Sequence, residues 1–524
     1  MKKSLFPLFA VLFAASAVAA PPADFEARVE KLRKEVGVPG MAVAIVEDGK
    51  VTMAKGFGTR ALGLNEAVDA DTIFMTGSTG KAVTSAALAV LVDRGKIGWD
   101  DKVIDHMPDF AMYDPWVTRE ITIRDLLVHR SGLGLGEGDL LFVPRAGLSR
   151  AESVRRLRYL KPATSFRYGF AYDNVLYMVA GQLIEAVSGK TWEKFVAEDV
   201  FKPAGMLHST SDDDVRFTVA DRAYPHARMD GGLRGVGKQE RLDERDGLGR
   251  NAAPAGGLAV SANDMARWLI IQLNRGKLPE GEGRLFSEAQ SAQMWTPEVF
   301  VPTSKRPESL KLTVPNFSTY ALGWGVQDYR GTKVLQHSGA VLGFQTIVAL
   351  IPGKNVGFAI MINSEDSGIY AGLLYELYDH YLGFPPNDWP AKFSAYLKER
   401  AAKGLEAYKA DAAKPAKVGP SLPLARYVGT YADPWYGQIE VSQTKGKLSI
   451  DFKSTPRMNG ALDHWQYDSF VTRFTDKTIE PAYVTFALDA DGKITGVTMK
   501  PVSPIADFSY DYQDLSFTPV EKSK

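Results

Sequence analysis

Ser78 and Lys81 are the residues whose types and spacing in this sequence best suit covalent chemistry. They flank Thr79-Gly80, and an apolar run from Val83 to Leu91 follows them. Within a helix this spacing is close to one turn, so both side chains project to the same side and the lysine amine can reach the serine hydroxyl. A serine hydroxyl becomes a good nucleophile once a neighbouring base takes its proton, and the N-terminus of a helix favours the anion that forms. The segment therefore predicts an activated serine.

Two further segments carry groups that could serve such a serine. Tyr172 and Asn174 lie just over 90 residues beyond Ser78, at the predicted start of a helix, and His337 follows much later, directly before a pair of apolar strands. Taken singly, each residue has an ordinary structural interpretation. Asn174 could cap a helix, Tyr172 could be a core residue with a satisfied hydroxyl, and His337 could fill space. A second Ser-x-x-Lys segment occurs at residues 442–445, but it lies in a predicted β-turn with no helix behind it.

In this order and at these separations, the three segments resemble the motifs of the serine β-lactamase and penicillin-binding protein superfamily. The resemblance is greatest to the class C-like branch, which includes D-aminopeptidases and carboxylesterases. It covers residues 25–385, and three shorter segments look like landmarks of the family: 129–133, 256–258 and 322–325. The resemblance implies an α+β fold in which helices flank an antiparallel sheet and a helical subdomain accompanies it.

The resemblance also implies catalytic roles for four residues. Ser78 would attack a carbonyl carbon and form an acyl-enzyme, while Lys81 and Tyr172 together would accept the serine proton. Tyr172 with His337 would then return a proton to the leaving group. Which of Lys81 and Tyr172 is the acylation base stays open, as it does for related enzymes.

Three more residues are expected on the substrate side of the site. By the same resemblance, Asn174 would steady Lys81 and the substrate amide. The backbone N–H groups of Ser78 and Ala340 would hold the oxyanion, with Gly339 of the third motif beside them.

The sequence departs from the family pattern at His337, where the third motif usually begins with lysine. Imidazole has an ordinary pKa of about 6.5, so this side chain could be uncharged at neutral pH and both donate and accept a proton. A histidine here is more like the D-aminopeptidases than the classical β-lactamases. The resemblance favours a hydrolase of amides or peptides, including peptides with D-residues. A carboxylesterase or β-lactamase using the same site, and a non-catalytic penicillin-binding or receptor-like protein, remain alternatives.

Charge and composition exclude several other classes of protein. Lys and Arg total 62, as do Asp and Glu, so no net field attracts a polyanion and a nucleic-acid partner is not expected. The chain has no cysteine, which excludes disulfides, thiolate nucleophiles and cysteine zinc sites. We expect no cofactor and no metal, and a small molecule or short peptide as substrate. Whether the chain forms a homo-oligomer stays open.

Residues 1–19 have the pattern of a secretory signal peptide. Lys2 and Lys3 give a positive start, an apolar run covers residues 5–15, and Ala17-Val18-Ala19 is a cleavage site of the small-x-small type. The apolar run is shorter than the roughly 20 residues that cross a bilayer, so we expect no stable membrane anchor. The leader predicts a bacterial protein that is periplasmic or secreted after cleavage.

The candidate catalytic residues must be positioned by strands and helices, and the sequence patterns over residues 20–385 predict these elements. Apolar runs interrupted by the turns Asp48-Gly49 and Pro352-Gly353 predict a hairpin over 41–54 and a further strand pair over 346–362. A helix is predicted over 81–94 with Gly95 as its end signal, and another over 174–187 with Gly189 as its end signal. Strands at both ends of the segment, with helices between them, predict one α+β domain.

Two more regions follow this domain. Residues 386–423 are rich in Ala, Lys and Glu and then contain three prolines, which predicts a helix and a stiff linker. Short alternating strands over 424–524 predict a small all-β, barrel-like domain. Its segments 427–431 and 462–464 resemble the lipocalin-like domain that some relatives of the family carry. Such a domain could restrict access to the cleft, bind substrate, mediate self-association, or only pack.

Overall fold

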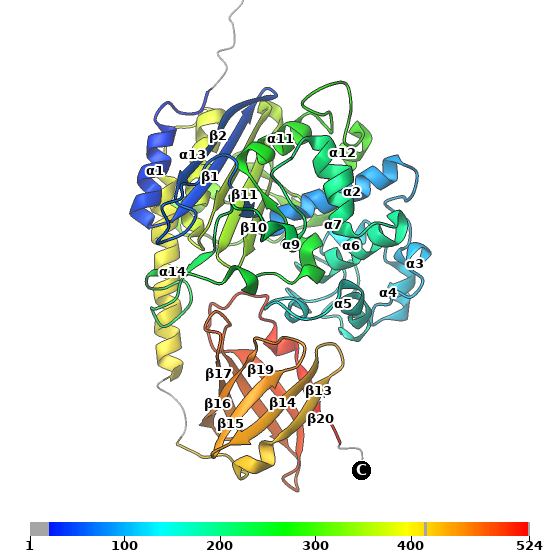
Figure 1. Cartoon of the computed structure of the whole chain (residues 1–524), viewed down its shortest axis with the longest axis vertical. Helices are drawn as coiled ribbons and strands as arrows, with labels where there is room; N and C mark the ends of the chain where they lie inside the picture. The colour runs from blue at the N-terminus through cyan, green and yellow to red at the C-terminus, as the bar shows by residue number, and fades with distance from the viewer. Residues whose placement is uncertain (1–19, 413–416, 522–524) are drawn as a thin grey trace, which may run out of the picture.

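The computed structural model describes residues 20–412 and 417–521. The predicted signal peptide, residues 1–19, lies outside the described residues. The chain folds into a mixed helix-and-sheet N-terminal domain, a long helix and a closed C-terminal barrel (Figure 1). The predicted α+β class with a small all-β domain is therefore confirmed.

The N-terminal domain is built on one antiparallel sheet of eight strands. The first predicted hairpin forms one edge of the sheet and pairs with the later strand pair, so that Met41 lies opposite Ile362. In spatial order the strands are β2 (Lys50–Gly58), β1 (Gly40–Glu47), β12 (Val356–Ile362), β11 (Phe344–Ile351), β10 (Thr332–Val341), β9 (Gly325–Tyr329), β8 (Ser318–Tyr320) and β7 (Val299–Phe300). Two small pairs accompany the sheet: β3 (Phe74–Met75) with β6 (Ala259–Val260), and β4 (His226–Arg228) with β5 (Gln239–Arg241).

Helices cover both faces of this sheet, so every residue of β1 and β12 is buried. Because side chains alternate along a strand, Met41 and Val43 join the core beside α1 (Phe25–Val36) and α13 (Ser367–Leu382). Ala42 and Ala44 face the other core, which contains α2 (Lys81–Asp93), α6 (Val175–Ser188) and α11 (Ala262–Leu273). Figure 1 shows α1 and α13 on one side of the sheet and α2 and α11 on the other.

The helices vary from single turns to long rods, and the longest is the last. They are α1 (Phe25–Val36), α2 (Lys81–Asp93), α3 (Val103–His106), α4 (Pro115–Glu120), α5 (Arg150–Arg156), α6 (Val175–Ser188), α7 (Trp192–Phe195), α8 (Lys202–Ala204), α9 (Asp213–Arg216), α10 (Ala253–Gly256), α11 (Ala262–Leu273), α12 (Glu288–Met294), α13 (Ser367–Leu382) and α14 (Trp389–Ala412). α14 occupies the region predicted as a helical linker and runs toward the barrel (Figure 1). Within the described residues, none of the helices combines the length and the apolar character that a membrane span requires.

The C-terminal barrel is closed by eight antiparallel strands. They are β13 (Gly429–Asp433), β14 (Gly437–Thr444), β15 (Lys447–Phe452), β16 (Asn459–Gln466), β17 (Ser469–Phe474), β18 (Ala482–Leu488), β19 (Ile494–Pro501) and β20 (Ser516–Pro519). Buried aromatic side chains such as Tyr436, Phe452 and Phe517 pack together within it. The second Ser-x-x-Lys segment ends β14 and enters a hairpin turn, where Lys445 has a positive φ of 51°.

Several contacts between the barrel and the N-terminal domain are polar. Arg156 on α5 donates to the carbonyl oxygen of Tyr436 at 2.5 Å. Arg457 forms an ion pair with Asp246, and the amide of Gly147 donates to the carbonyl oxygen of Ser454 at 3.0 Å. These contacts hold one end of the barrel against the helical side of the N-terminal domain.

Candidate active site

Ser78 lies at the turn where the sheet side of the domain meets helix α2. A single turn of 3-10 helix, Gly77–Gly80, contains it and leads directly into α2, as the sequence predicts. Its side chain is partly exposed, whereas its neighbours Gly77 and Thr79 are buried. Ser78 lines a cavity of about 380 Å³, so the hydroxyl is open to a ligand.

Lys81 is completely buried beneath this serine. Its Nζ lies 3.0 Å from Ser78 Oγ, 2.7 Å from Asn174 Oδ1 and 2.9 Å from the carbonyl oxygen of Ala255. The two carbonyl oxygens can only accept hydrogen bonds, so a neutral amine would use its two N–H groups on them. Its lone pair would then be left for the Ser78 hydroxyl, which is the geometry a general base requires.

Burial also disfavours the ammonium form of Lys81. Desolvation lowers the pKa of Lys81 to about 7, although the carboxylates of Asp139 and Asp173 act in the opposite direction. A substantial fraction of the amine is therefore neutral near pH 7. A buried lysine with a lowered pKa is a common feature of catalytic bases.

We expect the titration of Lys81 to control the pH dependence of the enzyme. Below a pH of about 7 the amine is protonated and cannot accept the serine proton, so kcat/KM should fall toward acid. Above that pH the profile should level off. The measurement is kcat/KM on an activated ester from pH 5 to 9, and a profile that is flat across pH 6 to 8 would contradict this assignment.

Tyr172 packs over the lysine, directly before helix α6. The Lys81 ammonium position lies 4.9 Å from the centre of the Tyr172 ring, and Phe508 of the barrel contacts the same ring edge-on at 6.0 Å. Burial raises the pKa of Tyr172 well above its ordinary value, and a hydrogen bond with Ser78 only partly opposes this. Because the phenolate is so disfavoured, the geometry favours Lys81 over Tyr172 as the base.

His337 on β10 has partners that differ from the predicted ones. Its Nδ1 lies 2.6 Å from the carbonyl oxygen of Ser338, which can only accept, so Nδ1 carries the proton. Its Nε2 then accepts from the Tyr320 hydroxyl at 2.7 Å. Burial and the nearby Lys81 lower the pKa of His337 to about 3. Both nitrogens are thus occupied, so this geometry does not support the predicted proton transfer with Tyr172.

A His337→Gln variant separates these two roles. Glutamine does not titrate, so we expect the fall in kcat/KM below about pH 7, the acid limb of the profile, to stay in place. We also expect kcat/KM to fall about tenfold or less, because Tyr320 loses its ring partner. The pH profile of the variant is the measurement. Disappearance of the limb would assign it to His337 and restore the predicted role in proton transfer.

The third motif approaches Ser78 so closely that side chains would not fit between them. A Cβ added to Gly339 would lie 1.9 Å from the carbonyl oxygen of Thr76 and 2.9 Å from the amide nitrogen of Ser78. A Cβ added to Gly77, whose φ is +53°, would lie 2.5 Å from the amide nitrogen of Ala340. The amides of Ser78 and Ala340 are therefore near neighbours, as an oxyanion hole requires.

Several residues at the site were not predicted from the sequence. Asp139 is fully buried and accepts a hydrogen bond from Asn174 Nδ2 at 2.8 Å. Burial raises the pKa of Asp139, whereas its hydrogen bonds with Ser509 and Asn174 and the nearby Lys81 lower it. The His129 ring lies against the Tyr172 ring with 4.2 Å between ring centres. Its place in the landmark segment 129–133 was the available signal, whereas nothing in the sequence marked Asp139.

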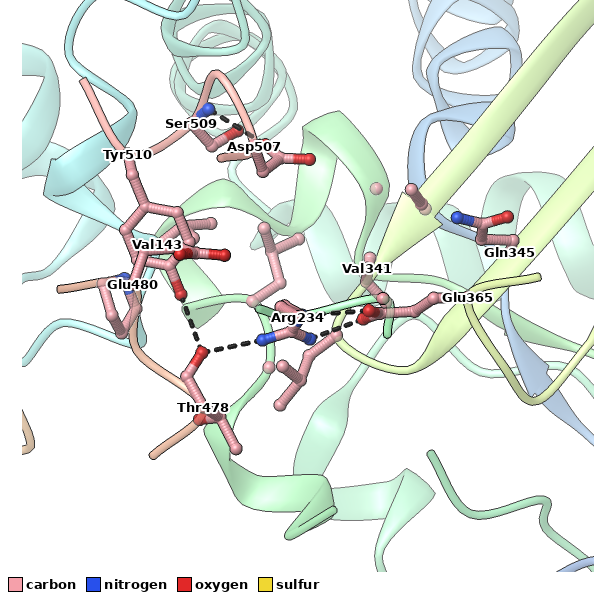
Figure 2. Close-up of a pocket in the computed structure, with 18 of the residues that line it drawn as sticks. Val143, Arg234, Val341, Gln345, Glu365, Thr478, Glu480, Asp507, Ser509 and Tyr510 are labelled. Atoms are coloured by element: carbon pink, nitrogen blue, oxygen red, sulfur yellow. Dashed lines mark hydrogen bonds and ion pairs between the residues drawn. The ribbon is translucent and has the colours of Figure 1, made fainter. Parts of the chain in front are cut away.

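Both domains line the cavity in front of Ser78. Arg234 crosses it, pairing with Glu365 of the N-terminal domain through a 2.9 Å contact and donating to the carbonyl oxygen of Thr478 in the barrel at 2.7 Å (Figure 2). Glu480 and Tyr510 of the barrel lie beside this bridge (Figure 2). Among residues 20–412 and 417–521, no three His, Cys, Asp or Glu side chains are grouped to hold a metal ion.

Comparisons with known proteins agree with this geometry. A family model described as Beta-lactamase matches residues 25–381, and one described as Domain of unknown function (DUF3471) matches residues 413–519. The chain is 32% identical to "Unguisins hydrolase ungD'" of Aspergillus campestris, covering 91% of this chain and 89% of that protein. It is 28% identical to "Penicillin-binding protein 4" of Amycolatopsis lactamdurans, covering 69% of this chain and 89% of that protein.

A solved structure shares the fold of most of the chain. It is the octameric penicillin-binding protein homologue from Pyrococcus abyssi, with a TM-score of 0.60 and 21% identity over 91% of this chain and 97% of that one. The family model, the relatives and this structure all agree with the resemblance that the three sequence motifs indicated. The chain belongs to the β-lactamase family, within the superfamily of serine β-lactamases and penicillin-binding proteins, and its relatives include named hydrolases.

Proposed function

We propose that this protein is an exported serine hydrolase that forms an acyl-enzyme at Ser78 and cleaves amide bonds in peptides, including peptides with D-residues. The observation that carries the proposal is the contact between Lys81 Nζ and Ser78 Oγ at 3.0 Å, with the lysine fully buried. A poor nucleophile thus lies beside a base of which a substantial fraction is neutral near pH 7, at the edge of a cavity. The leader over residues 1–19 supports export to the periplasm or beyond.

In the proposed acylation step, the Lys81 amine takes the hydroxyl proton and Ser78 Oγ bonds to the carbonyl carbon. The N–H groups of Ser78 and Ala340 hold the oxyanion. The Lys81 ammonium then gives its proton, through the Tyr172 hydroxyl, to the leaving nitrogen as the C–N bond breaks. Asn174 keeps the lysine in place through its 2.7 Å contact.

Deacylation reverses the same proton movements with water as the nucleophile. Lys81 takes a proton from water, the hydroxide bonds to the acyl carbon, and the ester bond to Ser78 breaks. The proton returns to Ser78 Oγ, and the product is a free carboxylic acid. The net reaction is hydrolysis, and no group on the enzyme is consumed.

The cavity walls support a peptide over a small ester or a β-lactam. Backbone groups near Ala340 and the polar bridge of Arg234 and Glu365 offer partners along an extended ligand. His337 is uncharged, so the third motif supplies no fixed cation for a β-lactam carboxylate. The names of the relatives also support a hydrolase, since two of them are called unguisins hydrolase.

A parallel substrate panel tests the proposal. D- and L-aminoacyl anilides, short-chain p-nitrophenyl esters and a chromogenic cephalosporin are assayed with the mature chain, and intact mass spectrometry locates any adduct. We expect turnover of anilides with an adduct at Ser78. Turnover of esters alone or of the cephalosporin alone would favour the alternative enzymes, and a stable adduct without turnover would favour a non-catalytic penicillin-binding protein.

A further inference from the structure

A loop of the C-terminal barrel forms part of the wall of the active site. It comprises residues 507–511, between β19 and β20, and Figure 2 shows the side chains of Asp507, Ser509 and Tyr510 beside the cavity. The carboxylate of Asp511 accepts the amide N–H groups of Gly138 at 2.7 Å and Leu140 at 2.9 Å. These two amides flank Asp139 in the chain, so the barrel holds the backbone that carries this buried carboxylate.

The same loop also reaches Asp139 directly. Ser509 Oγ donates to Asp139 Oδ2 at 2.7 Å, and this oxygen accepts Asn174 Nδ2 at 2.8 Å. Asn174 Oδ1 in turn accepts from Lys81, whose amine lies 3.0 Å from Ser78 Oγ. A continuous line of hydrogen bonds therefore connects the barrel to the reacting hydroxyl.

We propose that Ser509 is a positioning residue of the active site, which orients Lys81 through Asp139 and Asn174 and makes the barrel a required part of the catalytic apparatus. The proposal rests on the function proposed for Ser78. It assigns the C-terminal domain a task that its fold alone does not indicate, because the barrel strands themselves lie away from the reacting groups.

The physical reason is that Asp139 has few partners to replace a lost one. It is fully buried, and its Oδ1 has no hydrogen-bond partner among the described residues. Ser509 and Asn174 are the side chains that donate to its other oxygen. Without the Ser509 hydroxyl, Asn174 would be the one side-chain donor left among the described residues, and the orientation of the Asn174 amide would be less constrained.

Loss of the Ser509 donor should also change the charge near Lys81. The hydrogen bond favours the ionised form of Asp139, and that carboxylate favours the Lys81 ammonium. Removing the donor should therefore lower the pKa of Lys81 and move the acid limb of the activity to lower pH. A substitution of Ser509 leaves every other titratable residue around Lys81 and Asp139 in the chain. These residues are Tyr172, Asp173, Tyr177, His129, His337, Asp507 and Asp511.

The test compares Ser509→Ala and Ser509→Cys with the parent enzyme. The rate of Ser78 acylation by a p-nitrophenyl ester is followed by intact mass from pH 5 to 9, and folding is checked by near-UV circular dichroism. Ser469→Ala is the matched control, because this barrel serine pairs with Thr485 at 2.8 Å, away from the loop. We expect acylation to slow by roughly ten- to hundredfold in Ser509→Ala, with the acid limb at lower pH.

Ser509→Cys keeps the size of the side chain with a weaker donor, so we expect it to fall between serine and alanine in both rate and limb. If the alanine variant does not fold, the cysteine variant decides the question. The positioning role would be overturned if the Ser509 variants acylate at the parent's rate with the parent's acid limb. It would also be overturned if they acylate more slowly but with an acid limb at the same pH as the parent. Failure of the parent itself to acylate would instead overturn the proposed function.

Discussion

Replacing Ser78 with alanine should abolish acylation while leaving the fold intact. Every covalent step proposed for this site passes through Ser78 Oγ, which lies 3.0 Å from the Lys81 amine. We expect kcat/KM to fall by at least about 10⁴-fold. The side chain is partly exposed, so the loss of one hydroxyl should change the free energy of unfolding by about 1 kcal/mol or less.

The chain itself offers a matched control for this variant. Ser442 begins the second Ser-x-x-Lys segment, but its hydroxyl pairs with Ser449 at 2.9 Å on the barrel. Ser442→Ala should therefore keep full activity and gain the same mass on acylation as the parent enzyme. Turnover retained in Ser78→Ala, or an adduct that persists in that variant, would refute Ser78 as the nucleophile.

Replacing Lys81 with methionine should cause the second largest loss. Methionine has a similar length and is uncharged, so it fills the buried space without supplying a base. General base catalysis contributes about 10² to 10⁴-fold, and we expect kcat/KM to fall by that factor. The acid limb near pH 7 should disappear with the amine, because the limb reports its titration.

Two opposing effects should limit the change in stability of Lys81→Met. The variant removes an amine whose charged form is disfavoured by burial, but it leaves Asn174 Oδ1 and the Ala255 carbonyl without their donor. Thermal unfolding of the variant measures the balance. Lys445→Met is the matched control in the second Ser-x-x-Lys segment and should leave the rate and the pH profile unchanged. An acid limb that persists in Lys81→Met would assign it to another group.

Much of the fold could be predicted from the sequence because its signals are local. The apolar runs over residues 41–54 and 346–362 give strands, and these strands do meet in one sheet. Gly189 follows α6 in the left-handed conformation that ends a helix. The short alternating strands beyond residue 424 close into a barrel, which requires only regular pairing between neighbours.

The sequence by itself determined the pairing of Ser78 with Lys81, because one helical turn brings residues three apart to the same side whatever surrounds them. Only the tertiary structure decided the rest of the site. His337 has Tyr320 and a backbone carbonyl as partners, and Ser509 meets Asp139 across 370 residues of chain. Such contacts depend on how separate elements pack and on which buried polar atoms need hydrogen-bond partners there. The spacing of residues along the chain predicts neither the packing nor the partners.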